Sequence, residues 1–230
     1  MSEKIFRIEL RALSPVSVTK RVFGILYETY HFIPAWTMWN TLVKLYALEN
    51  SEGGRIDYKN AEERFKSVQL TNFYILEGNK ILRKSLDGKR RQYISSNLKT
   101  AIDTFSGTSL DSALYEREYL TAKKFVGWVR VMAELVDFFE NDLKGRTAFV
   151  GADKNTGFGK IRIENIVVVN ENLLSKFDGE KEVVKKISSL RNDREGFLPI
   201  ESTPKELFPI VLRRWNNEKG SGMTVVYCDG

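Results

Sequence analysis

The order of strand-like and helix-like stretches predicts an α+β fold with a ferredoxin-like (RRM-like) core. Three stretches carry this prediction: an alternating segment at residues 5–10, an apolar helical pattern after Pro34, and a strongly apolar segment at 160–169. With three further stretches between them, they give the order strand, helix, strand, strand, helix, strand.

The first strand and the first helix have the clearest patterns. Apolar and polar residues alternate from Ile5 to Leu10, which is typical of a strand, and Ser14-Pro15 ends it. Pro34 marks a helix start, because its fixed φ angle suits the first turn. Apolar residues then recur at helical spacing: Trp36, Trp39, Leu42, Val43, Tyr46 and Ala47.

The middle of the chain is less regular. We expect a short helix at 58–68, a strand at 69–76, a charged loop at 78–92 and strands at 93–105, 106–120 and 123–131. The range 51–92 is predicted to be a long insertion before the second core strand. A second helix follows at 132–145, where Leu135, Phe138, Phe139 and Leu143 form an apolar stripe and Gly145 ends it.

The pattern changes near residue 169, which divides the expected organisation into two parts. Residues 1–169 would form the core, and residues 170–230 a C-terminal lobe packed on it. In that lobe we expect a helix near 180–190, a further helical stretch at 202–222 and a closing strand at 223–230.

Composition predicts a soluble, cytoplasmic protein with a polyanionic partner. The 230 residues are 42% hydrophobic and 29% charged, and the net charge of +6 favours phosphate-rich partners. The start of the chain has no apolar leader, and no stretch is apolar enough to cross a membrane. A single cysteine, Cys228, excludes an internal disulfide and a cysteine-built zinc site. The sequence predicts no metal and no small-molecule cofactor.

The stretch "GADKNTGFGKIRIENI" (151–166) is the main candidate binding site. Its glycines would let backbone N–H groups approach a phosphate, and nearby cations would add positive charge. It is neither a Walker loop nor a dinucleotide fingerprint, because a strand follows it where both motifs need a helix. A plain tight turn explains the spacing equally well. The candidate residues are Gly151, Lys154, Gly157, Phe158, Gly159, Lys160 and Arg162.

A second candidate is the basic loop at 80–91, where cations greatly outnumber the single acid, Asp87. With Phe73 and Tyr93 near it in sequence, it would suit a surface that follows a nucleic-acid backbone and stacks bases. Its RNA-binding candidates are Lys84, Lys89, Arg90 and Arg91.

His31 is the only histidine of the sequence, so any imidazole acid–base chemistry depends on it. It is the one catalytic candidate, although a packed or surface histidine is the more common case. No group of acids has a spacing typical of metal ligands.

The order of these motifs resembles the RAMP superfamily of CRISPR-associated proteins. "SPVSV…G…YHFIPAWTMWNTLV" is similar to its opening, "KTAIDTFSGTSLDSALYEREYLTAKKFVGWVRV" to its middle segment, and "VGADKNTGFGKIRI" to its glycine-rich signature. The similarity extends from Ile5 to Val169. Gly151, Gly157, Phe158, Gly159 and Lys160 match the signature, and Ile33, Pro34 and Thr37 match the opening of the first helix.

The resemblance implies an RRM-like fold that binds CRISPR RNA and other effector subunits in a type III-like ribonucleoprotein of antiviral defence. Two departures refine it. "AWTMWN" stands where the family has a small-residue helix start, and the segment between Ser14 and Phe32 lacks the aspartate that cleaves target RNA in the backbone subunits.

Three functions therefore remain open. The first is a non-catalytic RNA-binding subunit. The second is a metal-independent CRISPR RNA endoribonuclease that uses His31, with Tyr27, Tyr30 or a lysine as helpers. The third is an assembly subunit that binds protein only, with Trp36, Trp39 and Trp128 as interface anchors.

Overall fold

The computed structural model describes residues 4–51, 53–82, 92–102, 109–169, 207–216 and 220–229. The fold is α+β, with three sheets and few helices among these residues. The predicted basic-loop residues Lys84, Lys89, Arg90 and Arg91 lie outside this range, as does the helix expected near 180–190.

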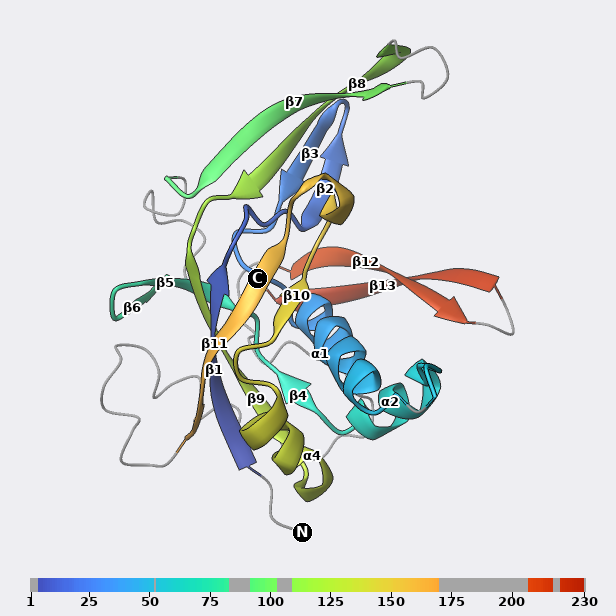
Figure 1. Ribbon diagram of the computed structural model, residues 1–230. Coiled ribbons are helices and arrows are strands. Elements are labelled where there is room, and N and C mark those ends of the chain that lie inside the picture. The colour runs from blue at the N-terminus through green and yellow to red at the C-terminus, as the bar shows by residue number, and fades with distance from the viewer. Residues whose placement is uncertain are drawn as a thin grey trace.

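A seven-stranded sheet forms the centre of the described fold (Figure 1). Its order is β10-β11-β1-β9-β5-β6, and β4 also pairs with β9. All pairings described for it are antiparallel. The strands are β1 (Lys4–Ala12), β4 (Gln69–Leu70), β5 (Tyr74–Glu77), β6 (Lys80–Leu82), β9 (Lys124–Val131), β10 (Thr147–Phe149) and β11 (Lys160–Val168).

Helices cover one face of this sheet. They are α1 (Ala35–Glu49), α2 (Tyr58–Phe65), α4 (Ala133–Asp137) and the π-helical turn η1 (Phe138–Asp142) that continues α4. Alternation along β1 turns Phe6, Ile8 and Leu10 toward them, and Met38 and Leu42 of α1 complete the contact. All five side chains are at most 1% exposed, so this layer is the main hydrophobic core.

The start of α1 is fixed by a side chain from the segment between β4 and β5. Pro34 precedes the helix with an extended backbone, as expected for a helix start after proline. The N–H of Ala35 donates to Asn72 Oδ1 at 2.9 Å, which satisfies one of the free amides of the first turn. The first strand and the first helix therefore agree with the sequence pattern.

A smaller, four-stranded sheet stands apart from the main one (Figure 1). Its order is β2-β3-β8-β7, in which β3 and β8 are parallel and the other pairs antiparallel. The strands are β2 (Thr19–Phe23), β3 (Leu26–Thr29), β7 (Ile94–Ile102) and β8 (Ser109–Leu120). Gly24 turns β2 into β3 with a positive φ of 58°.

The strand pairing corrects the prediction that residues 51–92 form an insertion. β4, β5 and β6 all come from this range and all belong to the main sheet. Where the structure describes them, the segments at 93–105 and 106–120, predicted as core strands, instead form the antiparallel strands β7 and β8 of the small sheet. Local alternation identified them as strands, but it carries no information on which sheet they join.

The C-terminal region contributes a two-stranded antiparallel sheet. β12 (Leu207–Asn216) pairs with β13 (Gly220–Asp229) along their whole length. The closing strand agrees with the sequence pattern. The helix expected at 202–222 is wrong for the residues that the structure describes there, because 207–216 form β12 and 220–222 begin β13. The apolar residues of β12 alternate with a period that suits a strand as well as a helix over so short a length.

Candidate nucleic-acid interface

The glycine-rich loop, residues Gly151–Gly159, joins β10 to β11. These strands pair with Phe149 opposite Lys160, and the N–H of Val150 donates to the Gly159 carbonyl at 2.9 Å. Within the loop, residues Lys154–Thr156 make one 3₁₀ turn. Gly157 ends that turn in the left-handed region, and the Phe158 N–H donates back to the Asp153 carbonyl at 3.2 Å.

Two of the three glycines are required by close contact with the protein's own backbone. A Cβ at Gly151 would lie 2.0 Å from the Ser17 carbonyl oxygen, and one at Gly159 would lie 1.9 Å from that of Val150. Both residues also have positive φ angles, of 76° each. The loop therefore folds tightly against the segment that follows β1.

The expectation that the Gly159 amide faces a phosphate is wrong. Gly159 is buried, and its N–H donates to the Pro15 carbonyl at 2.7 Å. Residues 154–157 are exposed, as are Lys160 and Arg162 at the start of β11. The part of the loop that can meet a ligand is thus its outer turn, and the cations around it are the groups that can meet a phosphate.

A surface hollow of about 420 Å³ lies between α1, the start of α2 and the glycine-rich loop. We call it the lysine hollow, because Lys44 of α1 and Lys154 of the loop both line it. Its lining residues are Thr37, Asn40, Thr41, Val43, Lys44, Tyr58, Glu62, Phe149, Gly151 and Lys154.

The electrostatic environment of the lysine hollow disfavours the charged form of Lys154. Burial, together with the charge of Lys44, lowers the pKa of Lys154 below its ordinary value of 10.5. Within the described part of the chain, the ammonium group of neither lysine has an ion pair or a hydrogen bond. Glu62 at the rim is the acid that lines the hollow. An anion bound here would relieve the repulsion between the two lysines.

Sequence reasoning found Lys154 but missed Lys44. A signal was present, since Thr37, Asn40, Thr41 and Lys44 recur at helical spacing and define a polar face of α1. The apolar residues of the same helix give the stronger sequence signal, and they mark its other, buried face.

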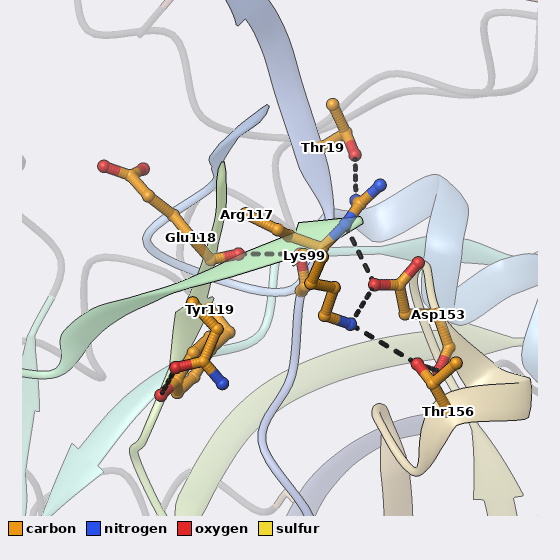
Figure 2. Close-up of polar contacts among 9 residues, drawn as sticks. Thr19, Lys99, Arg117, Glu118, Tyr119, Asp153 and Thr156 are labelled. Atoms are coloured by element: carbon orange, nitrogen blue, oxygen red, sulfur yellow. Dashed lines mark hydrogen bonds and ion pairs between the residues drawn. The ribbon is translucent and has the colours of Figure 1, made fainter. Parts of the chain in front are cut away.

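On the other side of the loop, Asp153 joins two cations of the small sheet (Figure 2). Its Oδ2 lies 2.5 Å from Lys99 Nζ on β7 and 3.0 Å from Arg117 Nε on β8. Arg117 Nη1 also donates to Thr19 Oγ1 at 3.0 Å, and Lys99 Nζ donates to Thr156 Oγ1 at 3.4 Å. We call Asp153, Lys99 and Arg117 the Asp153 cluster.

Aromatic rings hold the cations of the Asp153 cluster. Lys99 Nζ lies 4.2 Å from the ring centre of Phe158, and Arg117 lies 4.6 Å from that of Tyr27. Phe158 in turn packs edge-on against Tyr119 at 5.3 Å. Phe158, predicted as an RNA contact, is therefore half-buried and attaches the loop to the small sheet.

His31 and two of the three tryptophans named as candidates lie in or near the core. His31 is half-buried just before α1, while Glu28, the nearest acid in sequence, is ion-paired with Lys20 and Arg21. Trp128 is fully buried, and Trp39 is 8% exposed with its ring N–H donating to the Phe65 carbonyl. Two of the three proposed interface anchors are thus core residues.

The described residues hold neither a metal-binding cluster nor a membrane-spanning helix. Within them, no group of three or more histidine, cysteine or acidic side chains gathers closely enough to hold a metal ion. None of the helices in that part of the chain combines the length and the apolar character that crossing a membrane needs.

Comparison with known proteins identifies a shared fold. No protein-family model matches the chain, and no curated protein matches it in sequence. Among solved structures, it resembles a chain of the type III-B Cmr-beta bound to cognate target RNA, with a TM-score of 0.51 and 9% identity over 70% of this chain and 96% of that one. A chain of the apo state of type III-B Cmr-beta gives a TM-score of 0.50 and 9% identity over 73% and 98%. At this identity the likeness shows the fold alone.

Proposed function

We propose that this protein is a non-catalytic RNA-binding subunit of a type III CRISPR effector ribonucleoprotein. The fold it shares with chains of type III-B Cmr-beta supports the effector role, because one of those complexes is bound to cognate target RNA. CRISPR RNA and neighbouring effector subunits are then its partners.

The strand order supports a ferredoxin-like core. β11, β1, β9 and β5 lie side by side in antiparallel pairs, with α1 between β1 and β5 in the chain and α4 between β9 and β11. This is the order of a β-α-β-β-α-β unit. In this view β10 and β6 extend its two edges, and the small sheet is an addition.

The observation that carries the RNA-binding proposal is the lysine hollow. Lys44 and Lys154 both line it, and their mutual repulsion costs electrostatic free energy. Within the described residues, no acid forms an ion pair with either lysine to offset this cost. Such an arrangement is explained when the usual occupant is an anion. The polar groups of Thr37 and Asn40 beside the lysines suit phosphate and ribose oxygens.

The test measures binding of the purified protein to a fluorescein-labelled single-stranded repeat RNA in EDTA, over a range of salt concentrations. The double variant Lys44→Gln/Lys154→Gln is compared with Lys66→Gln/Lys144→Gln, which removes two exposed lysines outside the hollow. We expect only the first variant to reduce the slope of log K, the RNA association constant, against log salt concentration, by about 1.4. A single strand releases about 0.7 counterion per neutralised phosphate, and the variant removes two cations.

The other two functions give different outcomes in the same experiment. A discrete RNA product that disappears in His31→Ala would replace the proposal with the endoribonuclease. An absence of RNA binding at low salt, together with a stable complex with effector subunits, would replace it with the protein-only assembly subunit. Equal salt dependence of the two double variants would move the RNA site away from the hollow.

A further inference from the structure

Asp153 has the least usual backbone in the described part of the chain. Its φ of 56° and ψ of 31° place it in the left-handed region, where no other non-glycine residue of that part lies. Asp and Asn enter this region more readily than other side chains, but glycine does so more easily still. In a loop that already has three glycines, an aspartate at this position suggests a role for its carboxylate.

That carboxylate connects the loop to the small sheet at two points. Lys99 and Arg117 come from different strands, β7 and β8, and Asp153 lies within 3.0 Å of both. Its side chain is only 16% exposed, and those of Lys99 and Arg117 are 17% and 9% exposed. Ion pairs so shielded from water hold geometry better than pairs at the surface. Figure 2 shows the three side chains converging from separate elements.

The next residue along the chain faces the other way. Lys154 lines the lysine hollow, where the charge of Lys44 and partial burial both disfavour its ammonium group. An unrestrained loop would relax so that Lys154 moved out into water, because it lies on an exposed turn. Something must keep the loop in place against this repulsion.

We propose that Asp153 is a positioning residue, whose ion pairs with Lys99 and Arg117 hold Lys154 opposite Lys44 and so preform a phosphate site. This inference rests on the proposed RNA-binding function and adds the residue that organises it. In a preformed site, the free energy needed to bring the two lysines together is spent when the protein folds. Binding of the phosphate is then not weakened by that cost.

The proposal makes a prediction opposite to that of simple charge counting. Replacing any acid near an RNA site with a neutral residue should tighten binding, because it removes repulsion of phosphate. Glu62→Gln, at the rim of the hollow, should do so. Asp153→Asn removes the same charge and keeps a side chain that tolerates the left-handed region, yet we expect it to weaken binding about fivefold.

A double-mutant cycle distinguishes positioning from general damage. If Asp153 acts through Lys154, then Asp153→Asn should have less than about a twofold effect on RNA affinity in a Lys154→Gln background. A purely structural defect would lower affinity by the same factor in both backgrounds. Thermal melting of each variant reports whether it is folded, and Lys99→Gln takes the place of Asp153→Asn in the cycle should the latter fail to fold.

The outcomes separate this inference from the function on which it rests. Failure of the wild-type protein to bind RNA would remove both. RNA binding by the wild type, with Asp153→Asn binding as tightly as Glu62→Gln does, would overturn the positioning role alone. Equal losses from Asp153→Asn with and without Lys154 would do the same.

Discussion

Gly159→Ala is the substitution whose effect the structure defines most sharply. The new Cβ would lie 1.9 Å from the Val150 carbonyl oxygen, which is far inside van der Waals contact. Relief requires the chain to move at the point where β10 passes into the loop. Two hydrogen bonds depend on this point: Val150 N–H to the Gly159 carbonyl and Gly159 N–H to the Pro15 carbonyl.

The expected loss of stability follows from these contacts. A side chain at a φ of 76° costs about 1–2 kcal/mol, and each of the two buried hydrogen bonds contributes about 1 kcal/mol. We therefore expect Gly159→Ala to lower the free energy of unfolding by about 3–4 kcal/mol. Gly157→Ala is the matched control, because Gly157 also has a positive φ, of 90°, but nothing lies within 4 Å of its would-be Cβ. Only the backbone strain, about 1–2 kcal/mol, should remain there.

Thermal and urea unfolding of the two variants measure this difference. For a chain of this length, 1 kcal/mol shifts the melting temperature by about 2–4 °C, so Gly159→Ala should melt about 6–16 °C below the wild type. Gly157→Ala should stay within about 8 °C of it. The reasoning would be refuted if Gly159→Ala melted with the wild type and lost only RNA binding, since that result would assign Gly159 to the ligand.

Three further substitutions test the packing and charges described above by thermal melting against the wild type. Lys154→Met should raise stability at neutral pH, because burial and the facing lysine lower the pKa of Lys154 in the folded protein. The gain should fade as the pH rises from that lowered pKa to 10.5, because above 10.5 the wild-type lysine is neutral in both the folded and the unfolded chain. Burial would raise the pKa of Glu28, but Arg21 and a second cation lower it below 4.5, so Glu28→Gln should destabilise at neutral pH and progressively less as acid protonates the wild-type carboxylate. Gly127→Ala should cost about 1–3 kcal/mol, because its Cβ would lie 2.6 Å from the Phe73 ring, and Phe73→Leu should recover part of this loss.

Most helices and strands could be predicted from local patterns, because alternation and helical spacing directly reflect which side chains are buried. β1, α1 and β11 are examples, since each has a face whose residues are buried in the main core. Which strands pair with each other was harder to predict from the sequence. β7 and β8 alternate as core strands do, yet Leu98 is 63% exposed and Leu114 is 47% exposed in the small sheet.

The candidate site, too, could be predicted only in part from the sequence. The glycine-rich stretch marked the loop, and the excess of basic residues marked Lys154. Asp153 gave no signal, because its partner Lys99 is 54 residues distant in the chain and comes near only through the packing of the loop on the small sheet. Contacts that depend on tertiary packing have no local pattern from which to infer them.

The glycine-rich loop and the proposed RNA-binding groups are separable in this protein. Gly151 and Gly159 are needed where the loop meets the backbone of Ser17 and Val150, which is a requirement of the fold. Lys44, which completes the lysine hollow, lies outside the signature altogether. A chain with the same glycines but without the two lysines would keep the loop and lose the hollow's charge. A glycine pattern of this kind is therefore explained by the fold, and the proposal of an RNA ligand depends on the cations that face the hollow.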